Sequence, residues 1–158
     1  MSNYRLGAGK STLAKAIIAA YPAWTRLSID TILAERRGIW GVDYPPELYE
    51  TYQDEAEKVL NASLDELLRQ GKNAVLDRSF YAREDREEIK GRIEAAGGRW
   101  CLVYLKADRD LLWRRIRERR EKGINADSAL DIKEELLDSY VEGFEAPQGE
   151  GEIVVDVE

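Results

Sequence analysis

Short apolar runs alternate with amphipathic helical patterns along almost the whole chain. The first helical pattern covers residues 10–21 and stops at Pro22, and the longest one places apolar side chains about every four residues between positions 48 and 68. Four apolar runs separate the helices: TRLSID, NAVLD, RWCLVYLKA and EIVVDVE. Strands that alternate with helices form a parallel sheet covered on both faces. The pattern therefore predicts a doubly wound α/β fold.

Shorter helical patterns fill the remaining connections. They cover residues 31–37, a segment marked by Ile89 and Ile93, residues 109–122, and a last segment that carries Ile132, Leu136, Tyr140 and Phe144. A chain of 158 residues has the length of one ordinary domain, and neither a linker nor a repeat interrupts the pattern. We therefore expect a single domain over residues 1–158.

The segment GAGKST lies directly before the first predicted helix. Glycines allow consecutive backbone N–H groups to converge on phosphate oxygens at the positive end of a helix. In such a loop the lysine reaches the β- and γ-phosphates of a nucleotide and the next hydroxyl binds Mg²⁺. We therefore predict that ATP phosphates bind at Gly7, Ala8, Gly9, Lys10, Ser11 and Thr12, with Ser11 as a ligand of Mg²⁺.

This loop departs from the full phosphate-loop pattern at its start. In G-x-x-x-x-G-K-[ST] the first glycine would stand at position 4, which is Tyr4, and the strand that should precede it is replaced by the short polar run MSNYR. Three explanations stay open: an internal or altered start, a strand supplied by another segment or subunit, or a malformed loop. The alternative for GAGKST itself is a flexible turn before a helix capped by Ser11 or Thr12.

Two aspartates, Asp30 and Asp77, end the first two predicted strands. Because the carboxyl ends of parallel strands meet at one edge of a sheet, both carboxylates should face the phosphate loop. A carboxylate in that place can accept a proton from an attacking hydroxyl or hold Mg²⁺ through water. The alternative is a structural one, in which Asp30 caps the helix that follows it.

The segment RDLLWRRIRERREK holds six arginines and one lysine in fourteen residues, although the net charge of the chain is −7. Arg115 and Arg119 lie four positions apart and share a helix face, and the arginine fork suits phosphoryl oxygens. The alternative is a solvated face that Glu118 and Glu121 neutralise in part. We predict that at least one of these arginines contacts phosphate.

Composition narrows the remaining chemistry. Histidine is absent, so acid–base steps fall to carboxylates, lysine, tyrosine or cysteine, and the one cysteine, Cys101, lies in an apolar run where we expect it to be buried. The acidic balance argues against nonspecific binding to nucleic acid or membranes. Neither a membrane-spanning run nor a signal-peptide pattern is found, so we expect a cytoplasmic protein.

Taken in order, five stretches resemble the P-loop kinase family that includes zeta toxins, chloramphenicol phosphotransferases and the kinase domain of polynucleotide kinases. They are GAGKSTLAKAI, LSID, GKNAVLDRSFYAREDREEI, LVYLKADRDLLWRRIRER and NADS…FEAP. The resemblance implies a P-loop NTPase-like fold with an Arg-rich lid. It also implies transfer of the γ-phosphoryl group of ATP, with Mg²⁺, to a hydroxyl of a small molecule or a nucleic-acid end. The alternative is a nucleotide-binding protein with little or no turnover.

The same resemblance implies roles for single residues. Lys10, Asp30 and Arg119 would form the catalytic set, with Asp30 as the base that takes the proton of the acceptor hydroxyl. Asp77 and Arg78 would line the acceptor pocket together with Asp30.

The remaining roles concern the lid and the partners. Arg115 and Arg119 would bind the nucleotide from a lid at about residues 115–128, and Arg86 would be structural or linked to the substrate. The aromatic side chains Trp40, Tyr44, Tyr49 and Tyr52 could stack on an acceptor or pack as core. Partners would be a nucleotide and a small acceptor, and a homo-oligomer would result if a second chain supplied the missing strand.

Overall fold

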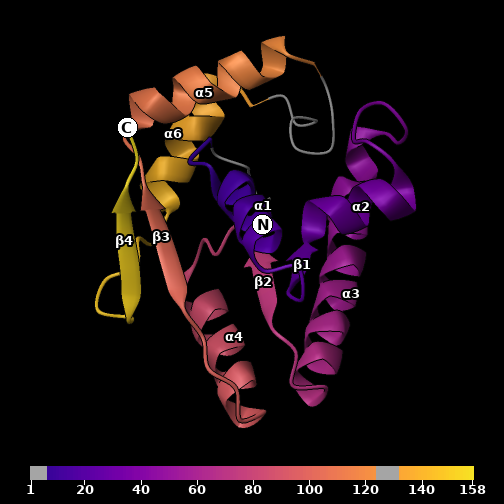
Figure 1. Cartoon of the computed structure of the whole chain (residues 1–158). Helices are drawn as coiled ribbons and strands as arrows, with labels where there is room; N and C mark the ends of the chain where they lie inside the picture. The colour runs from indigo at the N-terminus through magenta and orange to yellow at the C-terminus, as the bar shows by residue number, and fades with distance from the viewer. Residues whose placement is uncertain (1–6, 124–131) are drawn as a thin grey trace.

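The computed structural model describes residues 7–123 and 132–158, and it has a mixed α/β architecture (Figure 1). Its elements follow the predicted alternation of helices and strands. In chain order they are α1 (Lys10–Ala20), β1 (Thr25–Ser28), α2 (Ile29–Arg37), the 3-10 helix η1 (Pro46–Leu48), α3 (Tyr49–Arg69), β2 (Ala74–Asp77), α4 (Arg83–Ala95), β3 (Leu102–Lys106), α5 (Arg109–Glu121), α6 (Glu134–Gly143) and β4 (Glu152–Asp156).

The four strands of the described residues pair in parallel, which confirms the predicted fold class. β1 lies beside β2, with Ser28 opposite Asp77 at their carboxyl ends. β3 lies beside β4, with Lys106 opposite Asp156. Within residues 7–123 and 132–158 the strands form these two separate pairs. They do not form one continuous sheet, because no hydrogen-bonded ladder joins β2 to β3.

The first hydrophobic core lies under α2 and α3. Ala56, Leu60 and Leu64 follow one another at intervals of four along α3, and their exposed fractions are only 2%, 0% and 2%. This spacing stacks the three side chains on one helix face, which packs against β1 and α2. Gly71 ends the helix region with a φ of 64°, a backbone conformation that favours glycine.

The aromatic segment between α2 and α3 belongs to this core. Tyr44 and Tyr49 are buried at 7% and 8% exposure, and Trp40 and Tyr52 pack against the same cluster. Tyr44 meets Tyr52 edge-on at 5.1 Å between ring centroids. The prediction that these rings pack as core is therefore confirmed. The structure gives no support to the alternative, in which the rings stack on an acceptor.

A second core joins α5, α6 and the glycine-rich loop at Ala8. Its buried members are Ala8, Leu112, Ile116, Ile132, Leu137 and Tyr140. Arg109 fixes the start of α5 to α6, because its guanidinium lies 2.7 Å from both Asp138 and Glu134. Figure 1 shows α5 crossing above the carboxyl ends of β3 and β4. The glycine-rich loop therefore sits between the two cores, with Ala8 anchored in the second.

The prediction that Cys101 is buried is wrong, because its thiol is free and exposed. Cys101 directly precedes β3 and stays outside its ladder with β4. The strand pair itself is only partly covered, since Val103 is 38% exposed and Ile153 is 54% exposed. An apolar sequence run therefore does not become a fully buried strand here.

No helix in the two described ranges is long and apolar enough to span a membrane.

Candidate functional site

The loop before α1 has the backbone geometry of an anion-binding turn. Gly9 adopts the left-handed conformation with φ 95° and ψ 13°, and α1 begins at the next residue. A left-handed residue beside right-handed ones turns successive N–H groups toward one point, the arrangement called a nest. Among the described residues no side chain caps this helix start, so the alternative interpretation, a cap by Ser11 or Thr12, is wrong. The positive end of α1 is thus left without a side-chain cap.

Gly7 brings the same loop against the arginine-rich helix. A Cβ atom at this position would lie 2.9 Å from the Cβ of Arg115 and 3.3 Å from the carbonyl oxygen of Leu112. Such contacts are too close for a side chain, so only glycine lets α5 approach the loop this closely. Close packing against α5 therefore explains why a glycine stands at position 7.

Ser11 and Asp77 meet across the site. The Ser11 hydroxyl donates to Asp77 Oδ1 over 3.4 Å, although the two residues are 66 positions apart in sequence. Asp77 is buried, at 6% exposure, at the carboxyl end of β2. α1 packs along β2, which brings the first turn of the helix to the strand end. The structure therefore unites the predicted metal ligand with one of the two predicted carboxylates.

Arg26 belongs to this site and was not predicted from the sequence. Its Nε donates to Asp77 Oδ2 over 2.9 Å, its second terminal nitrogen forms a shorter contact with the same oxygen, and its other terminal nitrogen donates to Thr31 Oγ1 over 3.3 Å. The side chains of Arg26 and Asp77 are 17% and 3% exposed. The available signal was the charge at Arg26 inside a strand otherwise expected to be apolar.

Asp30 occupies a different place from the one expected. It lies in the first turn of α2 and not at the end of β1, because the helix begins at Ile29. The alternative role as a helix cap is also wrong: the cap is Ser28, whose hydroxyl accepts from the Thr31 N–H over 3.4 Å. Asp30 is half-buried two residues beyond the end of β1, and its role as a base stays a prediction.

Arg78 follows Asp77 directly and turns toward α3. Its terminal nitrogen lies 2.7 Å from Glu57 Oε1, its side chain is 6% exposed, and its guanidinium lies 5.2 Å from the centre of the Phe80 ring. The Nε of Arg78 is buried and has no hydrogen-bond partner among the described residues. An unpaired buried N–H is rare in folded proteins and commonly marks a place for water or a ligand.

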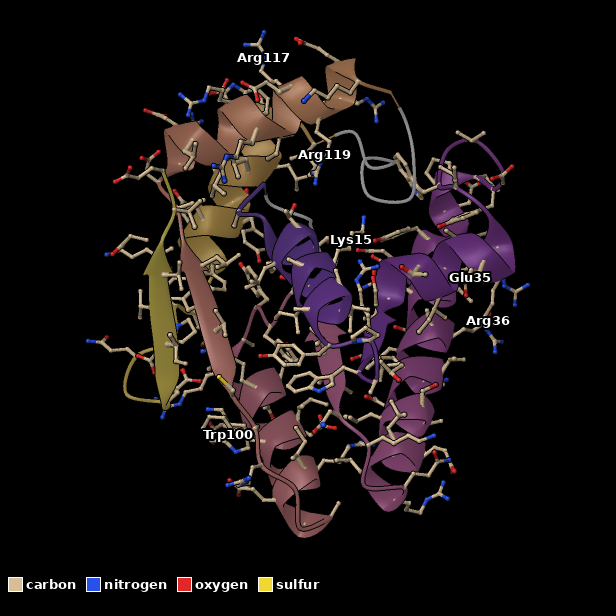
Figure 2. The ribbon with its side chains drawn as sticks, viewed as in Figure 1. Lys15, Glu35, Arg36, Trp100, Arg117 and Arg119 are labelled. Carbon is tan, nitrogen blue, oxygen red and sulfur yellow. The ribbon has the colours of Figure 1, made fainter. Side chains whose placement is uncertain are left out.

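The lid arginines lie on α5. The Arg115 guanidinium donates to the backbone oxygen of Glu158 over 2.7 Å. Figure 2 shows Arg119 on the side of α5 that faces the middle of the molecule and Arg117 on the outer side. Residues 124–128 of the predicted lid lie outside the described residues, so the lid remains a prediction.

Arg86 has a structural role in the fold. It is 2% exposed, its Nε and one terminal nitrogen each lie 2.7 Å from a different oxygen of Glu150, and its other terminal nitrogen donates to the Phe80 carbonyl over 2.9 Å. The Arg86 guanidinium, with Lys90 nearby, lowers the pKa of Glu150 to about 2. This network ties the loop after β2 to the segment before β4, and no local sequence pattern indicated Glu150 as the partner.

The donor set at Ser11 and Asp77 suits Mg²⁺. Both residues offer hard oxygen atoms, and Mg²⁺ commonly uses only one or two protein ligands while keeping several waters. Within the described ranges, no group of three or more Cys, Asp or Glu side chains is placed to hold a metal by itself. The site therefore fits an ion shared with a bound phosphate better than a closed metal cage.

This geometry agrees with the family of the chain. Residues 6–147 match the family model described as an AAA domain, so the chain belongs to this family, which has a P-loop kinase-like fold. The match begins one residue before Gly7 and contains Ser11, Arg26 and Asp77. No curated protein gave a significant match.

Two solved structures show the same fold. A "putative kinase" from Chloroflexus aurantiacus superposes with a TM-score of 0.74 at 20% identity, over 94% of this chain and 82% of that one. A gluconokinase from Sinorhizobium meliloti superposes with a TM-score of 0.60 at 23% identity, over 96% of this chain and 77% of that one. These similarities establish the fold.

Proposed function

We propose that the chain is an ATP-dependent kinase that transfers a γ-phosphoryl group to a hydroxyl of a small molecule or a nucleic-acid end. The observation that carries the proposal is the contact between the Ser11 hydroxyl and Asp77, at 3.4 Å, beside the left-handed turn at Gly9. The kinase-like fold of the family and of the two solved structures supports it. A closer relation to zeta toxins, chloramphenicol phosphotransferases or polynucleotide kinases stays a prediction.

Each residue of the site would contribute charge or position. The backbone amides at residues 7–12 and the Lys10 ammonium would hold the phosphates, and Ser11 with Asp77 would hold Mg²⁺. When bound, Mg²⁺ would neutralise charge on the phosphate oxygens. Asp30 would take the proton of the acceptor hydroxyl, and Arg119 would reach the phosphates from α5.

The acceptor would bind beside Arg78. Its buried Nε–H, which has no partner in the described part of the chain, could donate to an oxygen atom of the acceptor, and the Glu57 carboxylate holds the guanidinium in place. Arg78→Lys keeps the charge but removes this N–H, so it should raise KM for the acceptor more than it lowers kcat. An equal loss in ATP affinity would contradict this assignment.

The first test is stabilisation by ATP and Mg²⁺, measured as a shift of the thermal midpoint. At 100 times the dissociation constant a ligand adds about 2.7 kcal/mol to the free energy of unfolding. Lys10→Ala should remove the shift. Lys15→Ala is the matched control, because Lys15 is exposed on the same helix (Figure 2) and should leave the shift unchanged.

The second test separates a kinase from a protein that only binds nucleotide. ATP consumption is measured across a panel of neutral polyols, hydroxy acids, sugar phosphates and oligonucleotide ends. Turnover that disappears in Asp30→Asn while ATP stabilisation is retained would support transfer. Binding without consumption of ATP, with every acceptor, would favour the nucleotide-binding alternative.

A further inference from the structure

The two carboxylate oxygens of Asp77 have different partners. Oδ1 faces the Ser11 hydroxyl, whereas Oδ2 receives two nitrogens of Arg26. One side of the carboxylate therefore faces the positive charge of Arg26, and the other side faces the Ser11 hydroxyl. A metal held by Ser11 and Asp77 would share its carboxylate with a permanent cation.

Burial makes this cation hard to displace. The Asp77 side chain is 3% exposed and that of Arg26 is 17% exposed, and Thr31 takes a further hydrogen bond from the guanidinium. Arginine stays protonated at all ordinary pH values, and its fork fixes two donors on one oxygen. Breaking such a buried pair leaves an uncompensated charge, which is costly.

We propose that Arg26 is a resident counter-cation of the metal position. It neutralises Asp77 when no metal is present, so that phosphate groups can enter the loop without facing a bare carboxylate. It also repels a divalent ion placed on Oδ1 and Ser11. This inference deepens the proposed function: nucleotide binding should depend only weakly on Mg²⁺, because Arg26 already supplies part of the positive charge.

The size of the effect follows from Coulomb's law. A unit charge and a divalent ion about 5 Å apart repel by more than 1 kcal/mol even at the dielectric constant of water, which corresponds to about tenfold in affinity. Because the binding of ion and nucleotide is linked, weaker binding of Mg²⁺ lowers the gain in nucleotide affinity that a fixed, non-saturating Mg²⁺ concentration produces. Removing the charge of Arg26 should therefore raise this gain by about tenfold.

The test compares ADP affinity in EDTA with ADP affinity in millimolar Mg²⁺, by calorimetry on the whole chain. We expect the two dissociation constants of the wild type to differ less than about threefold, and those of Arg26→Gln to differ at least about tenfold. Arg26→Lys keeps the charge and should resemble the wild type. Arg117→Gln is the matched control, because Arg117 points away from the body of the molecule (Figure 2).

The outcomes separate this inference from the proposed function. If Arg26→Gln and the wild type show the same ratio of dissociation constants, the counter-cation role is wrong while the phosphate loop stands. A wild-type ratio above tenfold overturns the role without any variant, even if Arg26→Gln fails to fold. If ADP binds in neither buffer, the phosphate loop itself is wrong, and the role of Arg26 with it.

Discussion

The part of the molecule around β1 and β2 differs from the part around β3 and β4 in how well its strands are covered. In the first part, Leu27 and Ser28 of β1 are buried at 8% and 2% exposure, beside α2 and α3. In the second part, Ile153, Val154 and Val155 of β4 are 54%, 48% and 42% exposed. Parallel strands are normally covered on both faces. Similar apolar runs thus end in different environments.

The site residues follow this division. Arg26 and Asp77 come from the first strand pair, and Ser11 reaches them from α1. The second part contributes α5, which packs on Gly7, and the buried Glu150 that holds Arg86. The well-covered strand pair therefore contributes the charged residues of the site. The part around the other strand pair contributes residues that pack against the site or hold its neighbours in place.

The largest effect should come from cutting the connection between the two parts. Arg86→Ala removes one partner of a pair whose side chains are both 1% exposed, and the buried Glu150 carboxylate loses two 2.7 Å hydrogen bonds and keeps the longer contact with Lys90, at 3.5 Å. Loss of one partner of a buried pair costs about 3–5 kcal/mol. Urea denaturation should show this loss.

A matched variant on the same helix controls for the removal of an arginine. Arg92 also lies on α4, but its side chain is 30% exposed and its partners Asp65 and Glu88 are 48% and 63% exposed. Arg92→Ala should therefore cost only about 1 kcal/mol or less. Equal losses for the two variants would show that Arg86 does not join the two parts.

The next effect compares the coverage of the two parts directly. Leu60 is fully buried in the first core, so Leu60→Ala should cost about 2–5 kcal/mol. Val154→Ala removes apolar atoms from a side chain that is 48% exposed and should cost less than about 1 kcal/mol. Denaturation midpoints measure both, and a large loss for Val154→Ala would mean that β4 is covered in solution.

Acid should weaken the connection between the parts in a defined pH range. The pKa of Glu150 is about 2 in the folded chain, below its ordinary value of 4.5, because Arg86 donates to the carboxylate. The stabilisation is therefore complete above about pH 4.5 and is lost as the pH falls toward 2. Glu150→Gln should lack this part of the acid dependence when unfolding free energies are compared from pH 5 to 2.

The smallest effect concerns the edge of the second part. Cys101 is exposed, so its thiol should react with a thiol reagent in the native protein at a rate close to that of a small free thiol. Cys101→Ser should change the free energy of unfolding by less than about 0.5 kcal/mol. Protection of the thiol until the protein unfolds would show that β3 begins in a covered environment.

The sequence by itself determined the order and type of the elements. Apolar spacing every four residues fixed α3, because a helix brings such residues to one face, and the alternation of strands with helices fixed parallel pairing. It also indicated the glycine-rich turn before α1, since the residue types needed for such a turn are few. These features depend on residues that are close together in the sequence, so a local sequence pattern is enough to predict them.

Only the tertiary structure decided which charges meet and which apolar runs are covered. Arg26 and Asp77 are 51 positions apart, and Arg86 and Glu150 are 64 apart, so nothing in the neighbourhood of either residue specifies its partner. The predicted burial of Cys101 and the predicted strand-end position of Asp30 are wrong for the same reason. A local run of apolar residues, or a carboxylate after such a run, does not determine which elements pack beside it. Burial depends on the elements that arrive from elsewhere in the chain, and pairing of charges depends on burial.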